Sequence, residues 1–166
     1  MVDILIVCTG NICRSPMAAG LLKHMLPPHL RARVRVSSAG THALHGHQAA
    51  PPAVAAMARR GIDIRGHRAR QVSREMLTGA DLTLAMESEQ VQLLGKMVFW
   101  KRSPIRLLSA FDPGNDSRHP PEIEDPYGHP LEVYQQCLTL LHPCIEGVIH
   151  WLENHADFKT TNHHDA

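Results

Sequence analysis

A cysteine, an arginine and a serine lie close together near the start of the sequence. Residues 8–15 read Cys-Thr-Gly-Asn-Ile-Cys-Arg-Ser, which is a Cys-x5-Arg-Ser pattern. A cysteine thiolate is a nucleophile, and the planar arginine guanidinium can bind two oxygens of one phosphate group. The pattern therefore indicates chemistry on a phosphate, with Cys8 as nucleophile and Arg14 as phosphate clamp.

The length of this segment suits a loop that surrounds a tetrahedral dianion. Successive backbone N–H groups of such a loop can point inward, and the N-terminus of a following helix adds positive charge. The predicted phosphate ligands are the residues that follow Cys8, namely Thr9, Gly10, Asn11, Ile12, Cys13, Arg14 and Ser15. The same donors stabilise a thiolate, so we expect Cys8 to be an ionised nucleophile.

Three loop residues have further expected roles. Gly10 gives a tight turn its conformational freedom, and Asn11 can adopt a left-handed conformation while its amide ties the loop down. The Ser15 hydroxyl is placed to hydrogen-bond the Cys8 thiolate. The alternative is a buried structural cysteine beside an exposed arginine, and the strand and helix predicted around the loop disfavour it.

A second acidic residue is needed, because an alcohol leaving phosphate requires a proton. The best candidate is Asp125, in the sequence Asp-Pro-Tyr. Pro126 fixes the backbone beside the acid, and the Tyr127 ring can wall a pocket deep enough for an aryl substrate. Taken alone, an Asp-Pro pair in a loop more often marks only a turn.

The surrounding pattern predicts an α/β fold. Residues 3–7 predict a buried strand, and Ser15 as N-cap with Pro16 at the first helical position predicts a helix that Pro27 ends. Further strands are predicted over residues 34–37, 81–86 and 105–108, and helices over residues 52–60, 73–77, 87–97 and 131–152.

Strands that alternate with helices predict a three-layer sandwich, in which a four-stranded parallel sheet is flanked by helices. Ligands bind such sheets beyond the carboxyl ends of the strands, where Cys8 lies. We expect one domain over residues 1–158, a long loop over residues 112–129 and a flexible tail over residues 159–166.

Composition sets limits on the class of protein. The 166 residues, 43% of them hydrophobic, are enough for one core, and a net charge of +1 does not favour a nucleic-acid partner. Residues 4–7 are too short an apolar run for membrane insertion, so a cytoplasmic location is expected. In that compartment the four cysteines are better explained as catalytic, redox or buried thiols than as disulfides.

The chain resembles low-molecular-weight protein tyrosine phosphatases over almost its whole length. The resemblance covers residues 8–15, Ser38-Ala39-Gly40-Thr41, residues 81–86 and Asp125-Pro126-Tyr127. It implies phosphotyrosine hydrolysis through a cysteinyl-phosphate intermediate, without a metal or other cofactor and with inorganic phosphate as product. It also implies that Asp125 is the general acid.

The resemblance implies roles for residues that their own surroundings would not assign. By the family pattern, Asn11, Ser38 and His67 form, together with Ser15, a hydrogen-bond network that supports the phosphate loop. Cys13 is the second loop cysteine and can protect the nucleophile. Without the resemblance, Ser38 is equally a turn residue and His67 a surface histidine.

Leu44 takes the place where many members of the family have an aromatic residue lining the substrate cleft. In this, and in residues 69–73, the chain resembles the bacterial subgroup that dephosphorylates tyrosine autokinases of capsule and exopolysaccharide export. The implied partner is a phosphotyrosine protein, in particular a bacterial tyrosine autokinase. Leu44 and Tyr127 are then the walls of its binding pocket.

Two other functions are less consistent with the sequence than phosphotyrosine hydrolysis. A thioredoxin-coupled arsenate reductase shares the loop and the fold, but no cysteine lies between Cys13 and Cys137, and Cys137 and Cys144 lie on an apolar helix. A non-catalytic phosphotyrosine-binding module needs neither a nucleophile nor a proline-fixed acid.

A metal-binding module is suggested only by three histidines near residue 45. His42, His45 and His47 lack the i, i+4 spacing of helical metal ligands and have no cysteine partner. A solvated loop explains them better, and no metal ligand is predicted.

Overall fold

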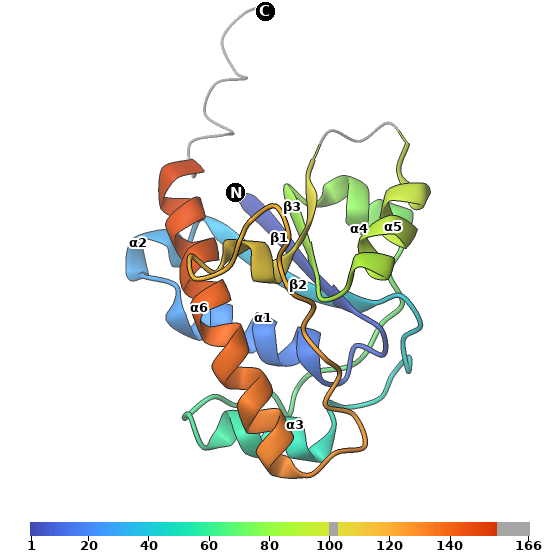
Figure 1. The fold of residues 1–166 in the computed structure, drawn as a ribbon, viewed down its shortest axis with the longest axis vertical. Helices are drawn as coiled ribbons and strands as arrows, with labels where there is room; N and C mark the ends of the chain where they lie inside the picture. Colours follow the sequence, from blue (N-terminus) through green and yellow to red (C-terminus); the bar gives the residue numbers. More distant parts are fainter. Residues whose placement is uncertain (100–102, 156–166) are drawn as a thin grey trace, which may run out of the picture.

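Four strands form one parallel sheet in the computed structural model, which describes residues 1–99 and 103–155 (Figure 1). The strand order is β2-β1-β3-β4. The strands are β1 (Val2–Cys8), β2 (Val34–Gly40), β3 (Leu82–Ala85) and β4 (Ile105–Leu107). β1 has a neighbour on each side and is buried on both faces, which explains its nearly continuous apolar sequence. The predicted fold class is confirmed.

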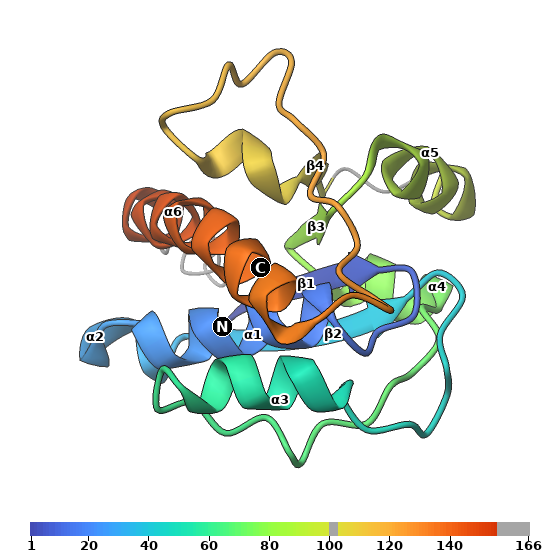
Figure 2. The ribbon, with the colours of Figure 1, turned by 60° about the horizontal axis from the view of Figure 1, so that its bottom comes forward.

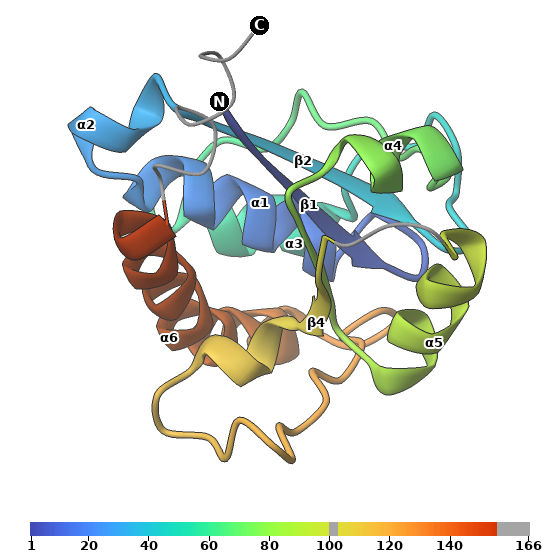
Figure 3. The ribbon, with the colours of Figure 1, turned by 90° about the horizontal axis from the view of Figure 1, so that it is seen from above.

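Helices cover both faces of the sheet (Figure 3). The helical segments are α1 (Arg14–Met25), α2 (Pro28–Arg31), α3 (Pro51–Ala58), α4 (Arg74–Gly79), α5 (Ser88–Met97), the 3-10 turn η1 (Leu108–Phe111) and α6 (Leu131–His155). Ile4 and Ile6 of β1 pack in the core with α1, α3 and α6, whereas Leu5 and Val7 pack with residues of α4 and α5. Successive side chains of a strand point to opposite faces of the sheet, so a strand covered by helices on both faces packs its side chains alternately into the two layers.

The register of the strands brings their carboxyl ends to one edge. Val7 of β1 pairs with Ala39 of β2 and with Ala85 of β3. The segments that follow β1 and β2 therefore leave the sheet side by side. The irregular residues 112–130, drawn in gold to orange, run from η1 back toward this edge before α6 begins (Figure 2).

The predicted elements differ from the structure in a few places. α1 begins at Arg14 with Cys13 as its N-cap, so the expected N-cap role of Ser15 is wrong. The Ser15 hydroxyl instead contacts side chains of the preceding loop. The helix predicted over residues 52–60 ends at Ala58, because a turn closed by Gly61, with a φ of 73°, follows it.

Two short helical segments were not predicted. α2 and η1 each contain four residues, too few for a 3.6-residue period to appear in the sequence. Of the predicted tail, residues 159–166 lie outside the described residues. Within the described ranges, no helix is long and apolar enough to span a membrane.

Candidate active site

The 8–15 loop joins the end of β1 to the start of α1. Cys8 is the last residue of β1 and is buried, and Arg14 is the first residue of α1. Asn11, between them, has a φ of 57°, a left-handed conformation that asparagine tolerates better than most residues. The loop is thus held between a central strand and a helix whose N-terminus carries partial positive charge.

The thiol of Cys8 contacts the hydroxyl of Ser15. Their Sγ and Oγ atoms are 2.9 Å apart, and both residues are buried. Ser15 Oγ also accepts a hydrogen bond of 2.8 Å from the side-chain amide of Asn11. Since that amide uses the hydroxyl oxygen as acceptor, the hydroxyl hydrogen is available to the Cys8 sulfur.

Asn11 is the centre of the network that the family resemblance implies. Its amide nitrogen donates to Ser15 and, at 3.0 Å, to Ser38 Oγ. Its side-chain oxygen accepts from the backbone N–H of Arg70 at 3.0 Å, and its backbone carbonyl contacts His67 Nε2 at 2.6 Å. The structure therefore brings Asn11, Ser15, Ser38 and His67 together and adds Arg70.

His67 acts in this network as a neutral donor. A carbonyl oxygen can only accept, so Nε2 carries the proton in the contact with Asn11. Burial lowers the pKa of His67, and although the hydrogen bond to Asn11 opposes this, the charge of Lys23 adds to the lowering. The second ring nitrogen thus has little tendency to take up a proton at neutral pH.

Arg14 is a buried cation held by two carboxylates. Nη1 donates to Glu87 Oε1 and, at 2.8 Å, to the Ile123 carbonyl, while Nη2 lies 3.3 Å from Asp125 Oδ2. Burial by itself would lower the pKa of Arg14, but the hydrogen bond to Glu87 and the charges of Asp125 and Cys8 outweigh it and raise the pKa.

One N–H of this guanidinium remains unused. Arg14 Nε is buried and has no hydrogen-bond partner among the described residues. An unpaired buried donor on a cation is costly unless a ligand oxygen satisfies it. An oxygen of an anion in the 8–15 loop would be such a partner.

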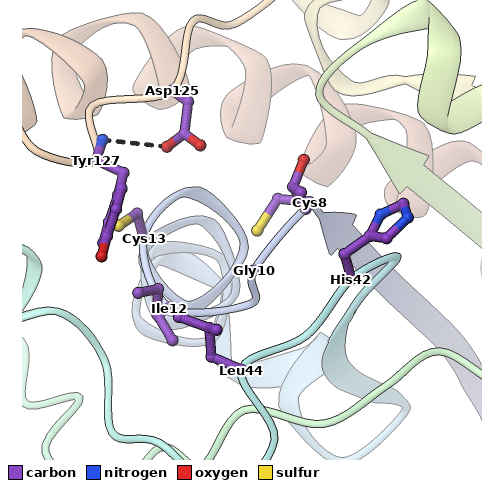
Figure 4. A pocket seen from close by; sticks show the side chains of 9 residues that line it. Cys8, Gly10, Ile12, Cys13, His42, Leu44, Asp125 and Tyr127 are labelled. Carbon is purple, nitrogen blue, oxygen red and sulfur yellow. Dashed lines mark hydrogen bonds between the residues drawn. The ribbon is translucent and has the colours of Figure 1, made fainter.

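A pocket of about 260 Å³ opens over the loop. Its lining residues are Cys8, Thr9, Gly10, Ile12, Cys13, His42, Leu44, Asp125 and Tyr127. Figure 4 shows the Cys8 sulfur directed into the space between Asp125 and Tyr127 on one side and Leu44 on the other. Leu44 and Tyr127 are 40% and 62% exposed, so both form the rim rather than the base.

Asp125 approaches the loop from the segment that precedes α6. Its Oδ1 accepts from the backbone N–H of Tyr127 at 3.1 Å, while the buried Pro126 lies between the two residues. Its other oxygen faces Arg14, and the side chain is 43% exposed. The carboxyl group is therefore fixed at the pocket wall and open to solvent.

The remaining cysteines are protonated thiols at neutral pH. Cys13 Sγ lies 3.5 Å from the hydroxyl of the buried Tyr134, and burial raises the pKa of Cys13 to about 11. Burial likewise raises the pKa of Cys137 and of Cys144 to about 12. All four cysteines are free.

Besides Arg70 and the pocket-lining His42, the residues Glu87 and Gln90 of the site were missed from the sequence. Glu87 binds Arg14, and the buried Gln90 donates to Thr9 Oγ1 at 3.0 Å while its carbonyl oxygen accepts from the backbone N–H groups of Met86 and Glu87. Glu87 and Gln90 form a capping box at the start of α5, and the sequence shows this i, i+3 pattern. The sequence does not show that the two residues contact the 8–15 loop.

The histidines near residue 45 do not gather into a metal site. His42 lines the pocket, and its Nδ1 contacts Thr41 Oγ1 at 3.2 Å. Across residues 1–99 and 103–155, no three His, Cys, Asp or Glu side chains are grouped so as to hold a metal ion.

Comparison with known proteins places this geometry in a family. The family model described as low molecular weight phosphotyrosine protein phosphatase matches residues 3–157. The probable low molecular weight protein-tyrosine-phosphatase EpsP of Ralstonia nicotianae is 40% identical over 149 residues, covering 90% of this chain and 92% of that protein. The low molecular weight protein-tyrosine-phosphatase Wzb of Escherichia coli K12 is 38% identical, covering 84% and 87%.

An arginine phosphatase of known structure is also similar in fold to this chain. The YwlE arginine phosphatase from Geobacillus stearothermophilus superimposes with a TM-score of 0.81 at 33% identity, covering 99% of this chain and 100% of that one.

Proposed function

The chain belongs to the low molecular weight phosphotyrosine protein phosphatase family, and on this premise we propose that it hydrolyses phosphotyrosine with Cys8, Arg14 and Asp125 as catalytic residues. One observation carries the proposal. Cys8 at the end of β1 and Asp125 before α6 line the same pocket although more than a hundred positions separate them in the chain. A nucleophile and an acid on one pocket are what phosphoryl transfer from an alcohol requires.

In the first step the Cys8 thiolate attacks phosphorus. An S–P bond forms as the P–O bond to the tyrosine ring breaks, and Asp125 gives its proton to the departing phenolate oxygen. The products are a cysteinyl-phosphate and a free tyrosine side chain. The Ser15 hydroxyl, 2.9 Å from Cys8 Sγ, stabilises the thiolate before attack.

In the second step water hydrolyses the cysteinyl-phosphate. Asp125, now ionised, takes a proton from water as the water oxygen attacks phosphorus, and the S–P bond breaks. Inorganic phosphate leaves, and the electron pair of the broken bond returns to Cys8. The hydrogen bond from Ser15 then stabilises the departing sulfur.

Arg14 and the loop amides stabilise the charge on the transferring group. A loose phosphoryl-transfer transition state spreads charge over three equatorial oxygens, so fixed donors around them supply most of the catalysis. Glu87 and Ile123 fix the Arg14 guanidinium before substrate arrives, and its unpaired Nε is a donor for one of these oxygens.

The pocket walls favour an aryl substrate. Ile12, Leu44 and Tyr127 present apolar and aromatic surface above Cys8. A tyrosine ring fills such a pocket while its phosphate reaches the loop, whereas a phosphoserine side chain is too short to do both. We therefore place phosphotyrosine ahead of phosphoserine.

A bacterial tyrosine autokinase of polysaccharide export, acting in the cytoplasm, is the proposed physiological substrate. The similarity to EpsP and Wzb supports this choice, as does Leu44 in place of a cleft aromatic residue. A Cys8→Ser variant used as a substrate trap in a lysate of the native host would test it. Recovery of the phosphorylated autokinase is the expected result, and recovery of other phosphotyrosine proteins alone would contradict it.

The catalytic proposal is tested by turnover of p-nitrophenyl phosphate. Cys8→Ser should abolish hydrolysis, whereas Cys144→Ser, which removes a buried thiol on α6, should retain it. Full activity of the Cys8 variant would exclude the scheme. Undetectable turnover by the parent protein would instead favour a phosphotyrosine-binding module, and thioredoxin-dependent arsenate reduction would favour the reductase.

A second candidate function is hydrolysis of phosphoarginine. The similarity to the YwlE arginine phosphatase is the observation that favours it. Against it, Ile12 and Leu44 offer no polar partner to a cationic guanidinium, and the Asp125 carboxylate, which also lines the pocket, already faces Arg14 and the Tyr127 N–H. Parallel kcat/KM measurements on phosphotyrosine and phosphoarginine peptides decide between them, and we expect the phosphotyrosine value to be the larger.

A further inference from the structure

The pocket wall that carries His42 and Leu44 is hydrogen-bonded to the 8–15 loop. This wall consists of residues 41–47, directly after β2 (Figure 4). Its backbone N–H groups donate to carbonyls of the 8–15 loop in three places: Thr41 to Cys8, His42 to Thr9 and Leu44 to Gly10, at 2.9, 2.9 and 3.1 Å. On this side, the hydrogen bonds to the 8–15 loop therefore set the position of the wall.

The other side of the wall is hydrogen-bonded to residues 69–72. Four backbone hydrogen bonds form on this side, each written with the N–H donor first and the carbonyl acceptor second. They are Gly40 to Arg70 at 2.9 Å, Val72 to Gly40 at 2.8 Å, Gly46 to Ala69 at 2.8 Å and Ala69 to His47 at 2.8 Å. They lie at Gly40, which directly precedes the wall, and at residues 46–47, where the wall ends. The backbone hydrogen bonds to residues 69–72 thus leave residues 41–45, the middle of the wall, without support from this side.

The side chain of Gln71 supplies that support. Its Oε1 accepts from the backbone N–H of Ala43 at 2.9 Å, and its Nε2 donates to the backbone carbonyl of Thr41 at 2.7 Å. The amide thus acts as a peptide group would, extending the bridge between Gly40 and Gln71 into the irregular segment. Gln71 itself is exposed and is not among the residues that line the pocket.

The start of the wall has little space in which to adjust when this support is lost. A Cβ placed on Gly40 would lie 2.5 Å from the Thr9 carbonyl oxygen, so β2 and the 8–15 loop are already in close contact there. Any relaxation must occur farther along the wall, at residues 42–44. Two of these residues, His42 and Leu44, line the pocket.

We infer that Gln71 is a positioning residue that sets the place of His42 and Leu44 and thereby the binding of the substrate ring, but not of its phosphate. The inference rests on the proposed phosphatase function and deepens it. Gln71 does not touch substrate and takes no part in bond making. We expect its effect to be confined to the wall, because hydrogen bonds of Asn11 that do not involve Gln71 hold the 8–15 loop.

Gln71→Met tests the inference, since methionine keeps the length of the side chain and removes both hydrogen bonds. Gln92→Met, at an exposed glutamine on α5, is the matched control. Dissociation constants would be measured for benzylphosphonate and for inorganic phosphate, with KM and kcat for p-nitrophenyl phosphate. Loss of two neutral hydrogen bonds should raise the benzylphosphonate constant and the KM about tenfold, with phosphate affinity and kcat within about twofold of the parent.

The ratio of the two dissociation constants separates the possible outcomes. An equal loss of benzylphosphonate and phosphate affinity, or a lower melting temperature with an unchanged ratio, would overturn the positioning role. Gln71→Glu keeps the acceptor for Ala43 but cannot donate to Thr41, so a ratio between those of the parent and Gln71→Met is expected. A parent protein that binds both ligands without turnover would contradict the proposed function and still allow this inference to be tested.

Discussion

The Sγ atom of Cys8 and the Oγ atom of Ser15 lie 2.9 Å apart, although Ser15 was expected to cap the following helix. Asn11 donates to the same hydroxyl oxygen, which directs the hydroxyl hydrogen toward sulfur. A hydrogen bond of this kind strengthens as the sulfur becomes anionic. In the proposed mechanism, Ser15 therefore stabilises the attacking thiolate and the same thiolate as a leaving group.

Replacement of Ser15 by alanine should slow turnover without preventing substrate binding. Hydrogen bonds to charged groups contribute about 2 kcal/mol, so kcat for p-nitrophenyl phosphate should fall roughly thirtyfold. Ser117→Ala, at an exposed serine, is the control. A kcat equal to that of the parent would show that the contact has no role in the reaction.

Replacement of Asp125 by asparagine should matter most for poor leaving groups. A general acid contributes on the order of a hundredfold or more, but a stable leaving group such as p-nitrophenolate needs little protonation. We expect a larger loss of kcat for phenyl phosphate than for p-nitrophenyl phosphate. Asp116→Asn, at an exposed aspartate, serves as the comparison. An equal loss on both substrates would argue against proton transfer by Asp125.

Replacement of Glu87 by glutamine should weaken phosphate binding. Glu87 accepts from the Arg14 guanidinium, and Gln keeps the size of the side chain but removes the charge that pairs with the buried cation. The inhibition constant of inorganic phosphate should rise about tenfold, and the free energy of unfolding should fall by about 1 kcal/mol or more. Glu89→Gln on the same helix turn is exposed and should change neither quantity.

His67 should make the folded protein sensitive to acid. Its pKa is lowered by burial below the ordinary 6.5, so the unfolded chain binds a proton more readily than the folded one. The stability that His67 contributes is complete above pH 6.5 and is lost as the pH falls through the folded-state pKa. Chemical unfolding across this range should show a shallower pH dependence for His67→Gln than for the parent. His45→Gln, at an exposed histidine, should retain the parent slope.

Peroxide should inactivate the protein reversibly through Cys8 and Cys13. Peroxide oxidises the Cys8 thiolate to a sulfenic acid, and attack by the Cys13 sulfur then forms a disulfide and releases water. Cys13 must first leave Tyr134 and lose a proton that its pKa of about 11 retains at neutral pH. Dithiothreitol should restore the parent far better than Cys13→Ser, and phosphate should slow inactivation of both. Peptide mapping that joins Cys8 to Cys137 or Cys144 would show the role of Cys13 to be wrong.

The parts of the fold that were predictable from the sequence are those governed by local pattern. The apolar β1 and the seven-residue spacing from Cys8 to Ser15 lie within one continuous segment, so the strand, the loop and the following helix could all be inferred. A helix was predicted over residues 131–152, and α6 runs through Pro143 to His155. In each case neighbouring residues carry the signal.

The contacts missed from the sequence depend on the tertiary fold. Glu87 lies 73 positions from Arg14, and Gln90 lies 81 positions from Thr9, so no local pattern shows that they meet. The misplaced N-cap has the same origin. Ser15 follows the capping rule locally, but contacts with Cys8 and Asn11 use its hydroxyl once the loop closes.

The left-handed Asn11 has a thermodynamic consequence for ligand binding. Such a conformation costs a non-glycine residue roughly 1 kcal/mol or more. Four hydrogen bonds maintain it: the side-chain amide donates two, the side-chain oxygen accepts one and the backbone carbonyl accepts one. These bonds form when the chain folds, so a bound anion has little backbone disorder left to remove. The entropy lost on phosphate binding should then come mainly from the anion itself, and little affinity is spent on ordering the loop.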